Sequence, residues 1–243
     1  MKNKKIIALM IGKKTSFGVP GKNIFKIHKK YLFEFPLISA KKSGLIDQLY
    51  ISTDCPTIKK FSKKYNPKII TRPKRIQSPN TLTEDVLQHA HEEIKKDVGG
   101  IDNIKYYILL YANGAFLNSS LIKKAVKKLD NNKKFDSCVG VINADMFTPI
   151  RAKTIDKKKG IKPFIPLNKF KKITSNRDSA GNAYFMDLSL QILRPKCFEK
   201  MNGNQKPFLW LGNKILPFEK EFGGDIDANW QFTILEKWLK KNF

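Results

Sequence analysis

Apolar runs of strand length alternate with amphipathic stretches over the first 142 residues. The first run, residues 6–11, is unbroken, which is typical of a strand covered on both faces in a parallel sheet. The amphipathic stretches place apolar residues three and four positions apart, as on one face of a helix. This alternation predicts an α/β fold. We expect strands at residues 6–11, 48–52, 68–71, 106–111 and 138–142, with helices at residues 36–42, 56–65, after 81–84 and around 121–129.

Two of the helices carry more specific signals. Thr81 followed by Glu84 has the sequence of a capping box, in which each side chain bonds the backbone of the other. The last helix has Trp230, Ile234 and Trp238 at four-residue spacing. They form an apolar stripe along one side of the helix.

The pattern changes between residue 143 and about residue 180, where prolines and lysines replace the periodicity. Regular elements return at residues 182–187 and 214–217. A chain of 243 residues suits one domain. We therefore expect a single domain, residues 1–243, with an irregular excursion at about 143–180.

The formal net charge of +26 raises the possibility of a nucleic-acid partner. The excess is almost all lysine, spread along the whole chain. Proteins that bind specific nucleic-acid sequences favour arginine, whose planar fork forms paired hydrogen bonds. The composition therefore argues against a specific nucleic-acid function. Arginine occurs only at Arg72, Arg75, Arg151, Arg177 and Arg194.

Cysteine spacing and apolar run lengths bear on the compartment. The three cysteines are far apart and form no C-x-x-C pair, which argues against a disulfide framework or a zinc site. The three histidines are not spaced as a metal cluster. No apolar run reaches the length of a membrane-spanning helix, and the first is too short for a signal peptide. We expect no membrane insertion and a cytoplasmic location.

The first strand leads into a basic, glycine-rich loop at residues 12–23. Glycines let backbone N–H groups approach an anion, and lysines supply positive charge, so such a loop can bind phosphates. The spacing fits neither a P-loop nor a dinucleotide fingerprint: five residues separate Gly12 from Gly18, and Asn23 stands where a P-loop has Ser or Thr. From these residues alone, an ordinary connection with solvated lysines is an equal alternative.

The loop resembles the signature of the acylneuraminate (CMP-sialic acid) cytidylyltransferases, R-x-G-S-K-G-x-P-x-K-N after a first strand. Lys13 stands at the first Arg, and Phe17 replaces the second basic residue. The residues in register are Ser16, Gly18, Pro20, Lys22 and Asn23.

Further motifs of this family follow in the same order. Residues 50–54 resemble its V-S-T-D strand end, and Arg72 with Pro73 resembles its R-P. Residues 109–117 occupy its L-L-Q-P-T-S-P-L-R segment, with Tyr111 for Gln and Asn113 for Thr. Asp225, Ile226 and Asp227 resemble its D-I-D. The resemblance covers roughly the full chain, and several weak motifs in order carry more weight than one.

The resemblance implies a three-layer α/β/α nucleotide-diphospho-sugar transferase fold, which is Rossmann-like with a mixed, mostly parallel sheet. It implies transfer of CMP from CTP to a sugar acid, nonulosonic or Kdo-type as in the related CMP-Kdo synthetases. Pyrophosphate is released, and the product serves surface polysaccharide biosynthesis. It also implies a homodimer in which the excursion helps close the neighbour's active site.

Positioning and electrostatics perform most of such a transfer. Lys13 and Lys22 are expected to hold the phosphates, and the catalytic residues are predicted to be Lys22, Lys13 and Asp227. Two of the predicted nucleotide contacts have plain alternatives. Asp54 could instead cap a helix, and Arg72 could instead form an ion pair with a surface acid. The predicted nucleotide-binding residues are Gly12, Lys13, Ser16, Gly18, Lys22, Asn23, Asp54, Arg72 and Asn113.

Asp225 and Asp227 are candidate ligands of Mg²⁺, which prefers oxygen ligands. On an extended segment, alternate residues point to the same side. A surface loop with two solvated acids is the alternative. Arg151 and Arg177 are predicted to bind the carboxylate of a small acidic sugar, or else to form structural ion pairs.

Three other functions remain open from the sequence. The departures at Phe17 and Tyr111 leave room for a phosphonate or another phosphorylated acceptor. They also fit a catalytically degenerate paralogue that binds nucleotide without turnover. Because D-I-D is also a D-x-D motif, a glycosyltransferase is the third alternative. The sequence does not identify the acceptor.

Overall fold

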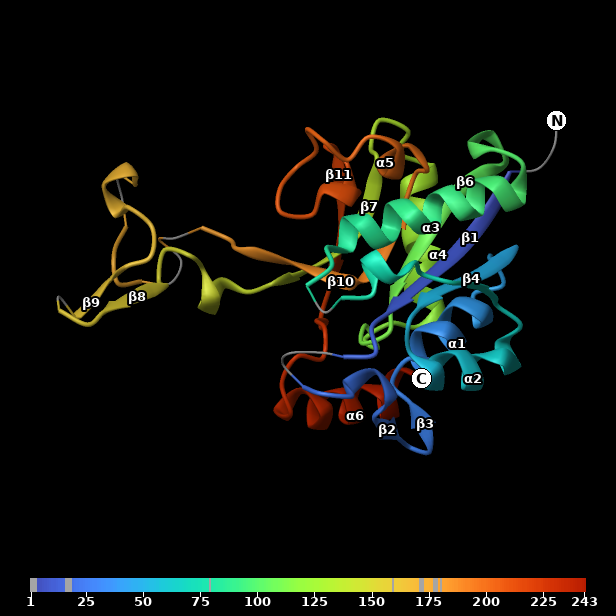
Figure 1. The fold of residues 1–243 in the computed structure, drawn as a ribbon. Coiled ribbons are helices and arrows are strands. Elements are labelled where there is room, and N and C mark those ends of the chain that lie inside the picture. The colour runs from blue at the N-terminus through green and yellow to red at the C-terminus, as the bar shows by residue number, and fades with distance from the viewer. Residues whose placement is uncertain are drawn as a thin grey trace.

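The computed structural model describes residues 4–15, 19–78, 80–158, 160–170, 173–176, 179 and 181–243. A seven-stranded sheet forms its centre (Figure 1). The strands of this sheet are β1 (Lys5–Gly12), β4 (Gln48–Thr53), β5 (Lys68–Ile70), β6 (Ile104–Tyr111), β7 (Ser137–Asn143), β10 (Tyr184–Leu193) and β11 (Ile215–Lys220). The α-helices are α1 (Glu34–Lys42), α2 (Pro56–Ser62), α3 (Thr83–Val98), α4 (Ser119–Asp130), α5 (Lys196–Glu199) and α6 (Trp230–Asn242).

The sheet is mixed and mostly parallel, as predicted. Its strand order is β11-β7-β10-β6-β1-β4-β5. β10 runs antiparallel to both of its neighbours, β6 and β7, whereas the other neighbouring strands pair in parallel. The carboxyl ends of β1, β4 and β6 therefore meet at one edge, where α/β sheets commonly bind ligands.

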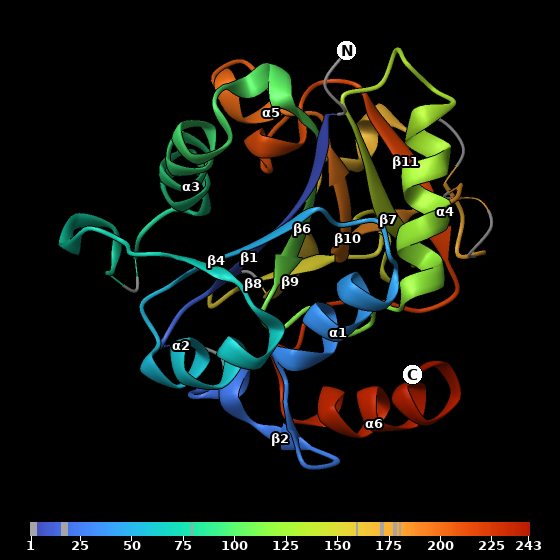
Figure 2. The same cartoon turned by 90° about the vertical axis from the view of Figure 1, so that its right-hand side faces the viewer.

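Helices cover both faces of the sheet (Figure 2). On β1, Ala8 and Met10 pack in one apolar cluster with residues of α1, α2 and α4. The alternate residues Ile7 and Leu9 pack in a second cluster with residues of α3 and α5. Both faces of β1 are therefore buried, which explains why its apolar run is unbroken. The prediction of a three-layer α/β/α fold is confirmed.

The segment expected to be irregular contains a hairpin of β8 (Lys153–Asp156) and β9 (Gly160–Pro163). The hairpin projects away from the sheet, carried by the long strand β10 (Figure 1). Ile155 is 86% exposed and Ile161 is 72% exposed. Sequence periodicity missed these strands because each has only four residues and neither buries a face in its own chain.

The capping box is a wrong prediction. Helix α3 begins at Thr83, and its N-cap position is taken by Leu82, whose side chain has no hydrogen-bonding atom. The predicted apolar face is confirmed, since Val86, Leu87 and further apolar residues of the helix are buried.

The apolar stripe predicted for the last helix packs in part: Ile234 and Trp238 are partly buried against the core, whereas Trp230 is not. Leu235 and Leu239 are the buried residues of α6, and Trp230 is 65% exposed. The helix packs on a third apolar cluster that includes Phe116 and Ile226. Ile226 is fully buried only four residues before α6, which sets the direction in which the helix starts. No helix in the described ranges is both long and apolar enough to cross a membrane.

Candidate active site

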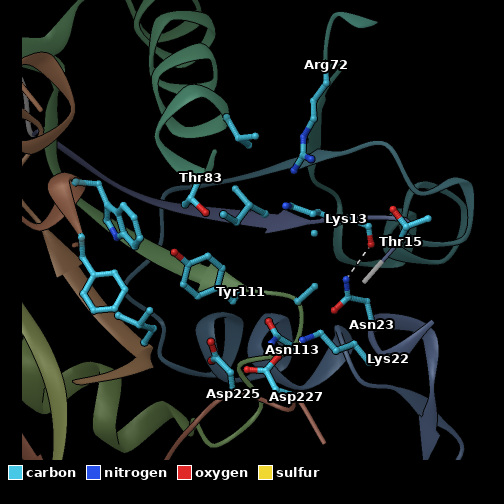
Figure 3. A pocket seen from close by; sticks show the side chains of 17 residues that line it. Lys13, Thr15, Lys22, Asn23, Arg72, Thr83, Tyr111, Asn113, Asp225 and Asp227 are labelled. Carbon is cyan, nitrogen blue, oxygen red and sulfur yellow. Dashed lines mark hydrogen bonds and ion pairs between the residues drawn. The ribbon is translucent and has the colours of Figure 1, made fainter. Parts of the chain in front are cut away.

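A pocket of about 440 Å³ lies at the carboxyl ends of β1 and β6 (Figure 3). Most of the predicted nucleotide-binding and metal-binding residues line it. They come from segments far apart in the sequence and face a common space. The predicted residues in its wall are Gly12, Lys13, Lys22, Asn23, Arg72, Asn113, Asp225 and Asp227.

Two predicted residues of the described chain do not line this pocket. Asp54 lies behind the pocket wall, 3.9 Å from the guanidinium of Arg72. Arg151 is exposed near the excursion and donates to the carbonyl of Ser175 at 3.2 Å, so it does not line its own chain's pocket. Ser16, Gly18 and Arg177 lie outside the described residues, as does Phe17.

Gly12 is required by packing at the end of β1. A Cβ atom here would lie 2.9 Å from the Cβ of Ala112 and 3.0 Å from the Cδ1 of Ile58. The carbonyl of Gly12 also accepts a hydrogen bond of 2.8 Å from the Thr53 hydroxyl. Because Gly12 has no side chain, β1, β6 and α2 converge closely at the floor of the pocket.

Asn23 holds the two ends of the basic loop together. Its side-chain Nδ2 donates to the carbonyl of Lys13 at 2.9 Å. Gly21, two residues earlier, has φ +72°, a left-handed conformation that favours glycine. Both features fix the turn that places Lys22 at the pocket.

Arg72 is a rigid, buried cation in the pocket wall and is only 4% exposed. Its Nε donates to the hydroxyl of Ser52 at 2.9 Å, and its Nη2 donates to the carbonyl of Ser52 at 2.6 Å. Its acidic neighbour is Asp54, whose side chain is largely buried, so the pairing with a surface acid that the sequence left open is not its role. Nor does Asp54 cap α2, because Cys55 holds that position and Asp54 accepts the backbone N–H of Lys14 at 2.9 Å.

Lys13 and Lys22 complete a cationic side of the pocket. Burial lowers the pKa of Lys13, and the positive charge of Arg72 lowers it further. Lys22 is 8% exposed and forms a direct ion pair with Asp227 at the edge of the pocket (Figure 3). Positive charge concentrated in this way binds a polyanion such as a triphosphate.

Asp225 and Asp227 face the pocket from the segment between β11 and α6 (Figure 3). Ile226 between them is fully buried, and its N–H donates to the carbonyl of Asn113 at 3.3 Å. This anchor turns the two carboxylates to the same side, as the extended spacing predicted.

The carboxyl of Asp225 is an orphaned polar group. Its Oδ1 is buried and has no hydrogen-bond partner among the residues that the structure describes. Burial raises the pKa of Asp225 to about 7, and the nearby carboxylates of Asp187 and Asp227 contribute. Two carboxylates with one oxygen unsatisfied fit a hard divalent cation, which prefers such ligands.

Aromatic residues form the opposite side of the pocket, and sequence reasoning missed most of them. Tyr111, Phe208 and Trp210 line it together with Leu188. The indole N–H of Trp210 donates to Gln191 at 2.9 Å, so the wall is fixed in place. The sequence pointed only to Tyr111, which replaces a residue of the family motif. Phe208 and Trp210 lie in a stretch that matches no motif.

A second group of potential metal ligands lies between α3 and α5, outside this pocket. It consists of His91, Glu92 and Glu199. The ammonium of Lys95 forms ion pairs with both glutamates, at 2.9 and 2.8 Å, and so neutralises part of their negative charge without a metal ion. Both ring nitrogens of His91 are hydrogen-bonded, to Tyr107 and Glu199. The group joins the two helices.

Comparison with known proteins agrees with this geometry. Residues 13–195 match the cytidylyltransferase family. A pseudaminic acid cytidylyltransferase of Campylobacter jejuni is 30% identical over 137 residues, which are 56% of each chain. A Helicobacter pylori protein, described as a pseudaminic acid cytidylyltransferase and a hydrolase, is 24% identical over 54% of this chain and 25% of its own length. The chain thus covers little more than half the length of the first relative.

Solved structures share the fold over nearly the whole chain. A CMP:2-keto-3-deoxy-manno-octonic acid synthetase complexed with CTP has a TM-score of 0.68 at 12% identity, covering 98% of this chain and 99% of its own. The 4-diphosphocytidyl-2C-methyl-D-erythritol synthase of Anaerococcus prevotii has a TM-score of 0.63 at 15% identity, covering 98% and 96%.

The family resemblance inferred from residues 12–23 and the later motifs is confirmed at this level. The match also favours a cytidylyltransferase over a D-x-D glycosyltransferase. The chain belongs to the cytidylyltransferase family.

Proposed function

We propose that this protein transfers CMP from CTP to a sugar acid and releases pyrophosphate. The observation that carries the proposal is the convergence of Lys13, Lys22 and Arg72 with Asp225 and Asp227 on one pocket. Cations next to a carboxylate pair suit a nucleoside triphosphate with its metal ion. The cytidylyltransferase family match supports CTP as the nucleotide.

Positioning and charge neutralisation are the main work of the chain's own residues. Lys13 and Arg72 would bind phosphate oxygens, and Lys22 would stabilise the charge that develops on the leaving pyrophosphate. The acceptor hydroxyl oxygen bonds to the α-phosphorus as the bond to pyrophosphate breaks, and the hydroxyl proton is released to water. Asp225 and Asp227 would hold Mg²⁺, which when bound supplies further positive charge to the triphosphate oxygens.

The aromatic wall supports an acceptor with apolar substituents. Tyr111, Phe208 and Trp210 offer rings rather than hydrogen-bonding groups to much of the acceptor side. Such a wall suits a nonulosonic acid that carries acylamino groups or deoxy carbons. The named relatives, which are pseudaminic acid cytidylyltransferases, support this acceptor class over a Kdo-type acid.

The exposed hairpin supports a homodimer. Ile155 and Ile161 lie mostly in solvent in a single chain, at the far end of an arm that leaves the sheet (Figure 1). Exposed apolar side chains gathered on a projecting element are typical of protein–protein contacts. Arg151 and Arg177 of one chain would then bind the acceptor carboxylate in the other chain's pocket. A cytoplasmic enzyme is proposed, since CTP is its substrate.

The proposed reaction predicts selective binding of CTP. In the presence of Mg²⁺, CTP should raise the melting temperature more than ATP, GTP or UTP. With CTP and a panel of nonulosonic and Kdo-type acids, pyrophosphate should appear only with an acceptor of the correct class. Equal thermal shifts with all four nucleotides would contradict a cytidylyltransferase.

Replacing two lysines of the same loop separates a phosphate contact from general positive charge. Lys22→Ala should lower kcat/KM by about 10²-fold or more, because a buried contact to the leaving phosphates is lost. Lys14→Ala removes the same charge from an exposed position outside the pocket and should stay within about 3-fold of wild type. Steady-state kinetics of pyrophosphate release measures both, and similar losses would show that the loop is only a basic surface.

Asp225→Asn should abolish metal binding without lowering the stability of the metal-free protein. The pKa of Asp225 is about 7 in the folded protein, above its ordinary value of 3.8, so its ionisation lowers the free energy of unfolding as pH rises between these values. An asparagine at this position does not ionise, so the variant does not lose this free energy of unfolding. In EDTA at pH 8 the variant should melt at least about 2 °C above wild type, with a smaller difference at pH 5. A variant that melts early yet turns over normally would exclude the metal role.

Introducing negative charge on the β8–β9 hairpin tests the dimer proposal. Ile155→Asp together with Ile161→Asp should convert a dimer to a monomer in analytical ultracentrifugation, because carboxylates would be buried in the contact. The same replacements should leave the fold of the single chain intact, so the variant should still melt cooperatively, since both side chains are exposed in one chain. A wild-type protein that is monomeric at all concentrations would contradict the proposal.

A further inference from the structure

Behind Asp225 lies a buried ion pair, Asp187 with Lys220, that the reaction proposed above does not use. The side chain of Lys220 is 2% exposed, and that of Asp187 is fully buried. Asp187 belongs to β10 and Lys220 to β11, so the pair reaches across the intervening strand β7. It crosses at Gly140, where a Cβ atom would lie 3.1 Å from the carboxylate of Asp187 and 3.2 Å from the Cδ of Lys220.

The hydrogen bonds of this pair are saturated. Besides its bond to Asp187, the ammonium of Lys220 donates to the carbonyl of Phe116 at 2.6 Å and to the hydroxyl of Ser189 at 2.9 Å. Asp187 Oδ1 accepts the N–H groups of Ser189 at 3.1 Å and Gly224 at 3.0 Å. A buried ion pair contributes little net stability even when it is fully bonded, so its structural consequence is of more interest than its energy.

The bond to Gly224 joins the ion pair to the carboxylate segment. Gly224 directly precedes Asp225 and has φ +124°, a conformation that few other residues adopt. At Gly223, an added Cβ would collide with the carboxylate of Asp187, so the backbone lies directly against it.

Asp225 is thus fixed from both sides through the backbone. Gly224 is held by Asp187, and Ile226 is held by the carbonyl of Asn113 at 3.3 Å. The Oδ1 of Asp225 itself has no hydrogen-bond partner among the described residues. The direction of this carboxylate therefore depends on where its backbone is held.

We propose that Asp187, neutralised by Lys220, is a positioning residue that holds Asp225 in place to bind the divalent cation. This inference rests on the proposed function, because it takes Asp225 to be a metal ligand. Lys220 is needed so that Asp187 can stand next to Asp225 without adding an uncompensated negative charge. The required chemistry at position 187 is a hydrogen-bond acceptor for the N–H of Gly224.

Two double variants test this acceptor while removing the ion pair in both. Lys220→Met with Asp187→Asn keeps an oxygen for the Gly224 N–H, whereas Lys220→Met with Asp187→Leu has similar volume and no acceptor. Mn²⁺ is titrated into each folded protein with α,β-methylene-CTP, a non-reacting analogue, and bound Mn²⁺ is followed by electron paramagnetic resonance. We expect the Asn variant to bind Mn²⁺ within about 3-fold of wild type and the Leu variant at least about 10-fold more weakly. Equal affinities in the two variants would overturn the proposal.

A third variant covers the case in which the Leu protein does not fold. Gly223→Ala leaves both charges of the ion pair in place and pushes the backbone away from Asp187. It should keep a cooperative melting transition and bind Mn²⁺ at least about 10-fold more weakly. Wild-type affinity in Gly223→Ala would overturn the positioning role.

Asp225→Asn separates this proposal from the proposed function. If wild type binds Mn²⁺ no better than Asp225→Asn, the metal site itself is wrong and the positioning role falls with it. If Asp225→Asn loses Mn²⁺ but the Asn and Leu double variants remain equal, the metal site stands and only the role of Asp187 is wrong.

Discussion

The site depends on charged groups that the fold keeps out of water at one end of the sheet. Burying an ion is costly unless a partner or hydrogen bonds replace its hydration. Arg72 meets this condition through Ser52, and Lys22 meets it through Asp227. Asp225 does not, since one of its oxygens is buried without a partner in the described structure. A cation bound at the Asp225 carboxyl would supply the partner that this group lacks and would stabilise its ionised form.

The antiparallel strand β10 explains how the two sides of the pocket coexist. A purely parallel sheet would present only strand ends and following loops at this edge. β10 instead runs through the centre of the sheet in the opposite direction, and its pairing with β7 shifts register between Asp187 and Gln191. Bulges of this kind re-aim side chains. One residue of the bulge, Leu188, faces the pocket, while Asp187 turns inward to Lys220.

The sequence predicted those features that depend on local periodicity. Unbroken apolar runs identified the central strands because burial on both faces leaves no polar position. The spacing of Asp225 and Asp227 placed both at the pocket because Ile226 between them is buried. The stripe on α6 was identified only in part: Ile234 and Trp238 pack against the core, but the most buried residues, Leu235 and Leu239, lie beside the stripe.

Features that depend on long-range contacts could not be predicted in the same way. The partners Asp187 and Lys220 are 33 residues apart and meet across a third strand, so no local pattern connects them. Trp210 in the pocket wall donates its indole N–H to Gln191, a fully buried residue of β10 that is 19 positions away in the sequence. Arg72 looked like a possible surface residue because its two hydrogen bonds go to Ser52, a residue 20 positions away.

The large net positive charge of the protein acts over a longer range than the contacts within the pocket. Among the lysines and arginines that the structure describes, only Lys13, Lys22 and Arg72 line the pocket. The rest create a long-range field that raises the encounter rate of any polyanion and weakens as salt increases. Such a field cannot distinguish CTP from another triphosphate, because all carry the same phosphate charge. Under the proposed function, selection would have to come from short-range contacts to the rest of the nucleotide. The loop held by Asn23, the guanidinium fixed by Ser52 and the carboxylate held beside Gly224 each have one defined position, and they would set where its phosphates lie.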